Sequence, residues 1–116
     1  MKILQVGSAL YDWGGIERYV VYLAEGLTAR GHHVFTTAPT GSPIAQRVVP
    51  THVPLATKGK HDVRTLRAYL KLFRSTRFDI VHVHFNPDFL VAGVAARLAK
   101  QRTVLTRHVA LPWSIG

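Results

Sequence analysis

Residues 2–31, KILQVGSALYDWGGIERYVVYLAEGLTARG, predict a strand, a glycine-containing loop and a helix in immediate succession. Residues 2–7 are apolar on both sides and end at Gly7, which is typical of a buried strand. Four apolar side chains then recur with helical spacing and form one stripe: Ile16, Val20, Leu23 and Leu27. We expect this helix to run from Gly15 to Arg30 and to end before Gly31, because glycine commonly follows a helix end.

The remainder of the chain alternates strand and helix patterns in the same way. Further strands are expected at 33–38, 52–55, 79–84 and 102–107, and further helices at 63–76 and 88–99. Residues 39–50 contain three prolines and a Gly-Ser pair, so we expect a loop there. Asp62 stands before the second helix and has the side chain of a helix cap.

Apolar strands separated by helices favour a parallel sheet that is covered by helices on both faces. The right-handed crossover rule then predicts an α/β fold, a Rossmann-like doubly wound sheet with strand order 3-2-1-4-5. We expect residues 1–116 to form one such domain, since 47% hydrophobic residues can fill a core. The first and fourth strands are then neighbours, and a ligand is expected in the crevice above their carboxyl ends.

The charge of the chain favours an anionic partner. Fifteen Lys and Arg against six Asp and Glu give a net charge of +9, which suits a phosphorylated ligand, an anionic membrane surface or nucleic acid. The sequence contains no cysteine, and this excludes disulfides and thiolate metal sites. The N-terminal apolar run is too short for a signal peptide or a membrane span, so we expect a cytoplasmic chain.

Gly14 and Gly15 stand where the first helix is expected to begin. The N–H groups at a helix start attract anions, and the missing side chains would let a diphosphate approach the backbone. The spacing from Gly7 does not match GxGxxG, and GxxxxGK[ST] is absent, which argues against a dinucleotide or P-loop site. Taken alone, the glycine pair is equally consistent with a flexible turn that caps the helix.

His82 and His84 are two positions apart in the fourth strand and therefore share one face. Together with Asp88 they have side chains that bind metals, but the third ligand would lie on a loop and no cysteine supports the site, so we expect no metal. We interpret His82 as a structural histidine and His84 as reaching the crevice. His108 leaves the fifth strand at the same sheet edge, where it could donate a hydrogen bond or share a proton.

The helix expected at 63–76 separates charged from apolar side chains. One face carries four basic side chains, which we call the basic stripe: Arg64, Arg67, Lys71 and Arg74. The stripe is either a solvated surface or a dock for anionic lipid headgroups that Lys58, Lys60 and Arg77 extend. Aromatic side chains are not interleaved with the basic ones, and this argues against a nucleic-acid partner.

Three segments together carry a family resemblance. They are MKILQVGS followed by GGIERYVVYLAEGLTARGHHV within 1–34, FDIVHVHFNP at 78–87 and VLTRH at 104–108. These segments resemble the N-terminal domain of family four, or group 1, retaining glycosyltransferases with the GT-B fold. Such enzymes have two Rossmann-like domains with the active site between them, and transfer sugars from nucleotide sugars, generally without a required metal.

The resemblance implies a role for each residue at the crevice. The backbone at Gly14 and Gly15 would contact the donor diphosphate, and His108 would act at the donor sugar or phosphate. The acceptor side would include three residues after the fourth strand: His84, Asn86 and Asp88. The nucleotide-diphosphate sugar is a substrate, and no cofactor is expected. The acceptor would be an envelope lipid, lipopolysaccharide or polysaccharide precursor, and the basic charge suits a peripheral position on the inner face of the membrane.

The resemblance also implies a C-terminal nucleotide-sugar domain with a paired-glutamate motif, which the 116 residues lack. We therefore expect a truncated, acceptor-side part of a hexosyltransferase that is inactive alone. Two other functions fit the residues: a non-catalytic basic Rossmann-like module that binds nucleic acid or a protein, and half of a nucleotide-sugar epimerase. The convergence of glycine and histidine at one sheet edge argues against the module, which would not need it.

Overall fold

The computed structural model describes residues 1–48, 51–59 and 61–106. Strands and helices alternate along all of the described chain, and a single five-stranded sheet has the order β3-β2-β1-β4-β5. Every strand pair is parallel, so the predicted Rossmann-like doubly wound α/β sheet is confirmed. The nine elements have these bounds: β1 Lys2–Val6, α1 Gly15–Ala29, β2 His33–Ala38, α2 Pro43–Arg47, β3 Thr51–Pro54, α3 Val63–Ser75, β4 Ile80–Val83, α4 Asn86–Leu98 and β5 Thr103–Leu105.

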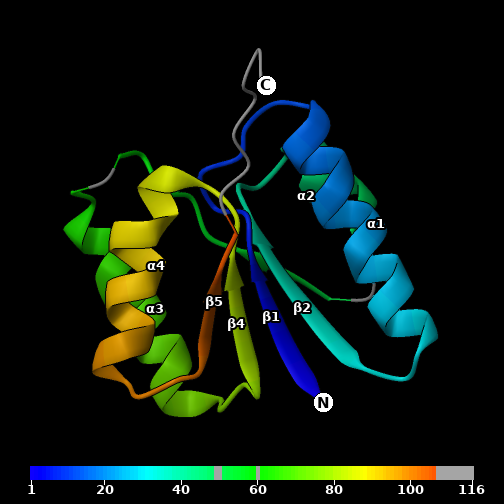
Figure 1. The fold of residues 1–116 in the computed structure, drawn as a ribbon. Coiled ribbons are helices and arrows are strands. Elements are labelled where there is room, and N and C mark those ends of the chain that lie inside the picture. Colours follow the sequence, from blue (N-terminus) through cyan, green and yellow to red (C-terminus); the bar gives the residue numbers. More distant parts are fainter. Residues whose placement is uncertain (49–50, 60, 107–116) are drawn as a thin grey trace, which may run out of the picture.

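The helices form a layer on each face of the sheet (Figure 1). α1 and α2 cover one face, and α3 and α4 pack side by side on the other. The buried apolar side chains accordingly form two clusters. Val20 and Val21 of α1 pack with Ile44 of α2 on the first face, while Tyr69 of α3 and Val91 of α4 pack with the sheet on the second. The covered faces explain why the strands read as apolar runs.

α1 ends as its sequence predicts. Gly31 has a φ of 91°, a left-handed conformation that glycine adopts without strain. The N–H of Gly31 donates to the carbonyl of Thr28, and the N–H of His32 donates to that of Leu27. These two bonds are the Schellman motif, which satisfies carbonyls at the end of the helix.

The expectation of a loop throughout residues 39–50 is wrong for part of the segment, because α2 forms within it. Ser42 caps this helix, with its Oγ accepting a hydrogen bond from the N–H of Ala45 at 3.2 Å. Pro43 occupies the first helical turn, where a missing N–H costs nothing. The Ser-Pro pair was thus a helix start rather than only a loop signal.

Gly7 brings β1 and β2 together at their carboxyl ends. Its N–H donates to the carbonyl of Thr37 at 2.9 Å, and a Cβ on Gly7 would lie 2.9 Å from that same oxygen. A side chain would therefore force the two strands apart.

None of the described helices combines the length and the apolar character that a membrane span requires.

Candidate functional site

The carboxyl ends of β1 and β4 lead directly to the two helices that begin at the crevice. Residues 7–14 connect β1 to α1, and His84 and Phe85 connect β4 to α4. The strands are paired in register up to Val6 and Val83, so both connections leave the sheet at the same level. α1 and α4 consequently begin at one edge of the sheet, on opposite faces (Figure 1).

The glycine pair leaves open space at the beginning of α1. Gly14 is extended, with a φ of −141°, and Gly15 is exposed. A Cβ on Gly15 would meet no atom within 4 Å, and a Cβ on Gly14 would meet only the end of the Glu17 side chain, at 3.2 Å. The packing of this chain therefore does not require glycine at position 15, and the space beside it is open.

A carboxylate already lies at this helix start. The Oε1 atom of Glu17 accepts the N–H of Gly14 at 3.0 Å, and the Glu17 side chain is 9% exposed. The next N–H groups of α1 have no partner within the helix, because the first turn of any α-helix lacks them. An anion can therefore approach the N–H groups of the first turn, with Glu17 as its electrostatic competitor.

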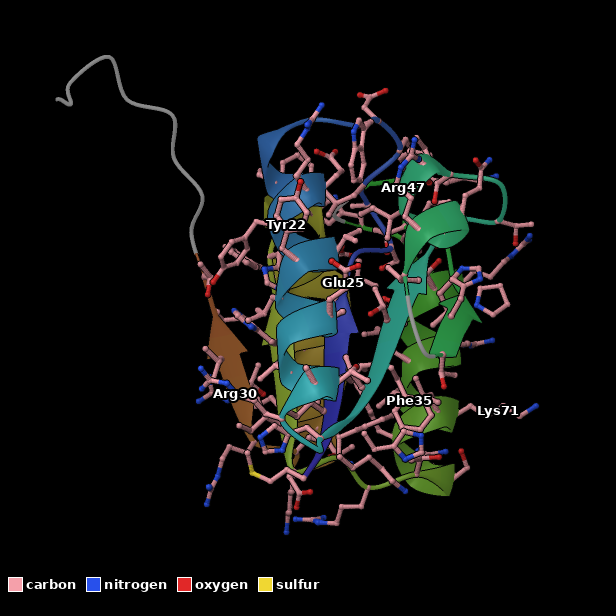
Figure 2. The ribbon with its side chains drawn as sticks, turned by 90° about the vertical axis from the view of Figure 1, so that its right-hand side faces the viewer. Tyr22, Glu25, Arg30, Phe35, Arg47 and Lys71 are labelled. Atoms are coloured by element: carbon pink, nitrogen blue, oxygen red, sulfur yellow. The ribbon has the colours of Figure 1, made fainter. Side chains whose placement is uncertain are left out.

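Two guanidinium groups flank Trp13 beside the glycine pair. Arg18 of α1 lies 5.3 Å and Arg47 of α2 lies 4.4 Å from the centre of the Trp13 ring. These are cation–π distances, and Arg47 is drawn toward the loop at the carboxyl edge of the sheet (Figure 2). The site thus has two cations near the open helix start, one of them from the helix that was not predicted.

Asp88 is fully buried beneath the glycine loop and holds it in place. Its Oδ1 accepts a hydrogen bond from the Ser8 hydroxyl at 2.7 Å, and its Oδ2 accepts one from the Ala9 N–H at 2.9 Å. Asp88 lies in the first turn of α4, whereas Ser8 and Ala9 directly follow β1. One carboxylate therefore ties the beginning of α4 to the loop that leads to α1.

Hydroxyl groups from three further elements extend this contact into a network. The Ser8 Oγ lies 2.6 Å from the Tyr69 hydroxyl and 3.0 Å from Thr57 Oγ1, and the Tyr69 hydroxyl lies 2.7 Å from Thr37 Oγ1. An ionised Asp88 can only accept, so Ser8 donates to it. Tyr69 can then donate to Ser8, and Thr37 to Tyr69. The hydroxyl dipoles point toward the carboxylate along this chain, which favours its charge.

Burial changes the pKa of both ionisable groups in the network. Desolvation raises the pKa of Asp88 above its ordinary value, although hydrogen bonds from Ser8, Thr57 and the Ala9 N–H oppose the shift. Desolvation also raises the pKa of Tyr69 well above its ordinary value, with the nearby Asp88 charge adding to the effect. The Tyr69 phenol therefore stays protonated and available as a donor at neutral pH.

The expectation that His84 reaches the crevice is wrong as to exposure, because its side chain is 1% exposed. Its Nε2 lies 2.6 Å from Gln5 Oε1, and the Gln5 amide in turn donates to the carbonyl of Val20. The His84 ring also lies 4.0 Å from that of His82 and 5.8 Å from that of Tyr19. Packing between β4, β1 and α1 thus turns His84 inward. The partly exposed His82 is hydrogen-bonded to Thr106, as a structural histidine would be.

Two other predicted site residues are described only in part or not at all. The backbone of Asn86 begins α4, but its side chain is outside the described part of the structure. His108 lies outside the described residues altogether. The structure therefore joins Asp88 to Ser8 and Ala9 in the loop that leads to the glycine pair, while the roles of His84, Asn86, Asp88 and His108 stay predictions.

Comparison with known proteins identifies the family. The family model described as Glycosyltransferase Family 4 matches residues 13–115, which is most of the chain. The chain belongs to glycosyltransferase family 4. No curated protein sequence matches it.

The fold of this family 4 domain is also found in solved GT-B glycosyltransferases. MurG of Acinetobacter baumannii superposes with a TM-score of 0.69 at 14% identity over 91% of this chain and 34% of MurG. The lipopolysaccharide outer core galactosyltransferase WaaB superposes with a TM-score of 0.61 at 14% identity over 92% of this chain and 32% of WaaB. The chain thus spans about a third of either enzyme.

The same fold also occurs in a protein that is not named as a glycosyltransferase. The C-terminal domain of the PF1911 hydrogenase from Pyrococcus furiosus superposes with a TM-score of 0.61 at 17% identity, over 90% of this chain and 89% of that domain. At such identities the superpositions establish the fold and do not distinguish one chemistry from another. The family match is what separates the glycosyltransferase assignment from the epimerase and binding-module alternatives.

The basic stripe lies on the surface of the family 4 domain. All four of its side chains are exposed along α3, and Lys71 projects away from the molecule (Figure 2). The opposite side of α3 buries Tyr69 and Phe73 in the core. The helix is therefore amphipathic as predicted, and both interpretations of the stripe, solvated surface and lipid dock, fit this placement.

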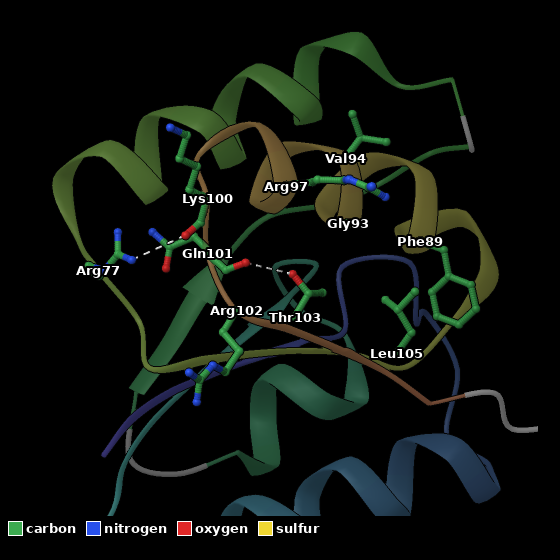
Figure 3. A pocket seen from close by; sticks show the side chains of 10 residues that line it. All are labelled: Arg77, Phe89, Gly93, Val94, Arg97, Lys100, Gln101, Arg102, Thr103 and Leu105. Atoms are coloured by element: carbon green, nitrogen blue, oxygen red, sulfur yellow. Dashed lines mark hydrogen bonds between the residues drawn. The ribbon is translucent and has the colours of Figure 1, made fainter.

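One hollow of the described surface is not lined by the glycine pair. It has a volume of about 640 Å³ and runs along α4 and the edge strand β5 (Figure 3). Its basic side chains come from Arg77, Arg97, Lys100 and Arg102. Of the predicted donor and acceptor residues that the structure describes, none lines it. Among the described residues, no three His, Asp or Glu side chains come close enough to hold a metal ion.

Sequence reasoning missed the residues that support the loop. Four hydroxyl-bearing residues lie far apart in the sequence and meet only in the folded chain: Ser8, Thr37, Thr57 and Tyr69. Neighbouring members of this series are 20 positions or more apart, except for Thr57 and Tyr69, which are closer. One signal was available, because a tyrosine on the apolar face of a helix needs a partner for its hydroxyl. The partner could not be named without the strand register.

Proposed function

We propose that this chain is the acceptor-side half of a retaining hexosyltransferase. The enzyme would move a sugar from a nucleotide-diphosphate donor to an envelope lipid, lipopolysaccharide or polysaccharide acceptor. Membership of family 4 supports the reaction class. The observation that carries the site is the open start of α1, where the exposed Gly15 stands among N–H groups that lack a partner within the helix and near the two cations at Trp13.

In this proposal the donor diphosphate lies on the backbone of Gly14 and Gly15. The N–H groups of the first turn of α1 and the two cations beside Trp13 would balance its charge. Asp88 is a positioning residue that fixes the loop through Ser8 and Ala9. Asn86 contributes to the acceptor side of the crevice, and the buried His84 supports that side through its contact with Gln5. His108 acts on the donor sugar or phosphate. Departure of the diphosphate and attack by the acceptor hydroxyl then share one face of the sugar.

The charge of the chain and its exposed basic stripe support the proposed acceptor class. A net charge of +9 and the exposed basic stripe suit a peripheral enzyme on the inner, anionic face of a membrane. We expect the chain alone to lack transferase activity, because the domain that holds most of the nucleotide would have to close the crevice. Sugar transfer from UDP-glucose or UDP-galactose by the purified 116 residues would contradict this part of the proposal.

The donor site can be tested by amide NMR with inorganic diphosphate as the probe. We expect the amide signals of Gly15 and Ile16 to shift on titration, and Gly15→Ala to weaken binding about fivefold or more because its Cβ occupies the ligand's space. Gly26→Ala is the matched control, since Gly26 is also exposed in α1 and a Cβ there meets nothing within 4 Å. Equal binding of diphosphate by the two variants would contradict the placement of the diphosphate at Gly15.

A further inference from the structure

Two hollows open side by side at the beginning of α3. The first has a volume of about 320 Å³ and a mainly apolar lining from α3 and α4: Val63, Leu66, Leu90 and Val91. The second has a volume of about 470 Å³ and includes Lys58, Arg64 and Thr65. His61 and Asp62 line both, so the two hollows are adjacent. Their volumes fall within the range of ligand sites, roughly 300–1,000 Å³.

The apolar hollow is formed by side chains that the fold leaves in water. Val63 is 60% exposed and Leu90 is 47% exposed, although both stand next to the core formed by α3 and α4. Covering exposed apolar surface is favourable by about 25 cal/mol per Å². A hydrocarbon chain inserted between Val63 and Leu90 would gain this free energy.

The polar hollow presents positive charge beside the apolar one. Asp62 is the one acidic residue among the described residues that line this hollow. Its carboxylate accepts hydrogen bonds from the N–H groups of Lys58 and Thr65, each at 3.0 Å, and from the Thr65 hydroxyl at 2.8 Å. Lys58 and Arg64 are exposed and point to solvent rather than to the core. The basic stripe continues from Arg64 along α3, so a phosphate here meets a cationic surface.

The polar hollow also adjoins the glycine loop. Thr57, next to Lys58, donates its N–H to the carbonyl of Ser8 at 2.8 Å, and its carbonyl accepts the Tyr11 hydroxyl at 3.0 Å. A headgroup held at Lys58 would therefore lie next to Thr57, which is hydrogen-bonded to Ser8 and Tyr11 in the loop that leads to Gly14 and Gly15.

We propose that the two hollows form one site for a phosphate-bearing lipid, with its hydrocarbon chain between Val63 and Leu90 and its phosphate at Lys58 and Arg64. The site specifies the acceptor class as a lipid phosphate or a molecule linked to one. That role as acceptor rests on the proposed transferase function, whereas lipid binding itself does not. The site differs from a diffuse electrostatic dock, which would use all four residues of the basic stripe equally.

Dodecyl phosphate below its micelle concentration is the probe, titrated into the labelled 116-residue chain and followed by amide NMR. Inorganic phosphate tests the headgroup alone and dodecyl maltoside tests the chain alone. We expect dodecyl phosphate to bind at least about tenfold more tightly than either, with shifts at residues 58–66 and around Leu90, since both hollows contribute. Binding no tighter than that of phosphate would overturn the proposal.

Matched pairs on the same helices then separate a site from a surface. Leu90→Ser and Leu98→Ser both change an exposed leucine of α4, but only Leu90 lines the hollow. Arg64→Gln and Arg74→Gln both change an exposed arginine of α3, but only Arg64 lies in the polar hollow. We expect about tenfold weaker binding for the first member of each pair and less than about twofold change for the second. Equal effects within the pairs would favour the diffuse dock instead.

Two measurements keep the outcomes distinct. Val63→Ser tests the apolar hollow from α3 should Leu90→Ser fail to fold, as judged by thermal unfolding followed by circular dichroism. The diphosphate titration of Gly15 is recorded on the same samples. Loss of lipid binding with diphosphate binding retained contradicts only the lipid site, whereas the reverse result contradicts only the donor site.

Discussion

The beginnings of α1 and α4 use one arrangement in two ways. Each helix follows a central strand, and each starts at the same edge of the sheet. α1 begins at an exposed glycine with open space around it, whereas the first turn of α4 carries Asp88, which is 0% exposed and bonded to Ser8 and Ala9. The buried start of α4 therefore holds the loop that presents the open start of α1.

This comparison also separates what supports the fold from what awaits a ligand. The Asp88 carboxylate at the start of α4 has its hydrogen-bond partners within the chain, and its removal should cost stability. At the start of α1, the first-turn N–H groups have no partner within the helix, and changes beside them should alter anion binding with little effect on folding. The following predictions test that division.

Asp88→Ala should give the largest loss of stability. It removes the acceptor of the Ser8 hydroxyl and of the buried Ala9 N–H, and an unpaired buried donor costs roughly 1–3 kcal/mol. We expect the free energy of unfolding in urea to fall by about 2 kcal/mol. Asp12→Ala, at an exposed position in the same loop, should change it by less than about 0.5 kcal/mol. Comparable effects of the two variants would show that Asp88 does not hold the loop.

The pH dependence of stability should identify the same carboxyl group. Because desolvation raises the pKa of Asp88 in the folded state, the folded chain binds more protons than the unfolded chain between the two pKa values. The protonated Asp88 therefore adds to the free energy of unfolding at low pH. This contribution is lost as the pH rises through the folded pKa, and the free energy of unfolding falls by at most about 1.4 kcal/mol per pH unit. Asp88→Asn should remove this fall.

The measurement is the difference in unfolding free energy between Asp88→Asn and the unaltered chain, from urea titrations between pH 4 and pH 8. As the pH rises above the ordinary pKa of a carboxyl group, the free energy of unfolding of Asp88→Asn should increase relative to that of the unaltered chain. Hydrogen bonds lower the pKa of Asp62 and give the opposite slope at acid pH, but both proteins contain Asp62, so its contribution cancels. A difference that is constant with pH would mean that Asp88 keeps an ordinary pKa.

The sequence predicted the parallel sheet and its strand order because both depend on short-range patterns. Apolar runs, helical spacing and the glycine after α1 each act within one element, and the crossover rule arranges the elements. The bounds differ from those expected by one or two residues, and α2 was missed because its Ser-Pro start lies among loop signals.

The candidate site was less predictable because its support depends on register. Sequence placed Gly14, His84 and Asp88 at one edge but could not show that Asp88 and His84 turn inward. That orientation depends on the pairing of β1 with β4, which sets Gln5 opposite His82 and brings Ser8 near α4. The same pairing decides which polar residues are buried, and hence which are structural.

Glu17→Gln should give the smallest effect and tests the start of α1 alone. Glutamine keeps an oxygen to accept the Gly14 N–H, so the cap is retained, but the negative charge beside the proposed diphosphate is removed. We expect binding of inorganic diphosphate to tighten about two- to fivefold at low salt and this gain to shrink at 0.5 M salt, as screening requires. Stability should fall by less than about 1 kcal/mol, since an acidic residue favours a helix start. Glu25→Gln, an exposed change later in the same helix, should leave diphosphate binding unaltered. Weaker binding by Glu17→Gln would make the carboxylate part of the ligand site and not its competitor, and the start of α1 would then resemble that of α4 in using an acid to organise its surroundings.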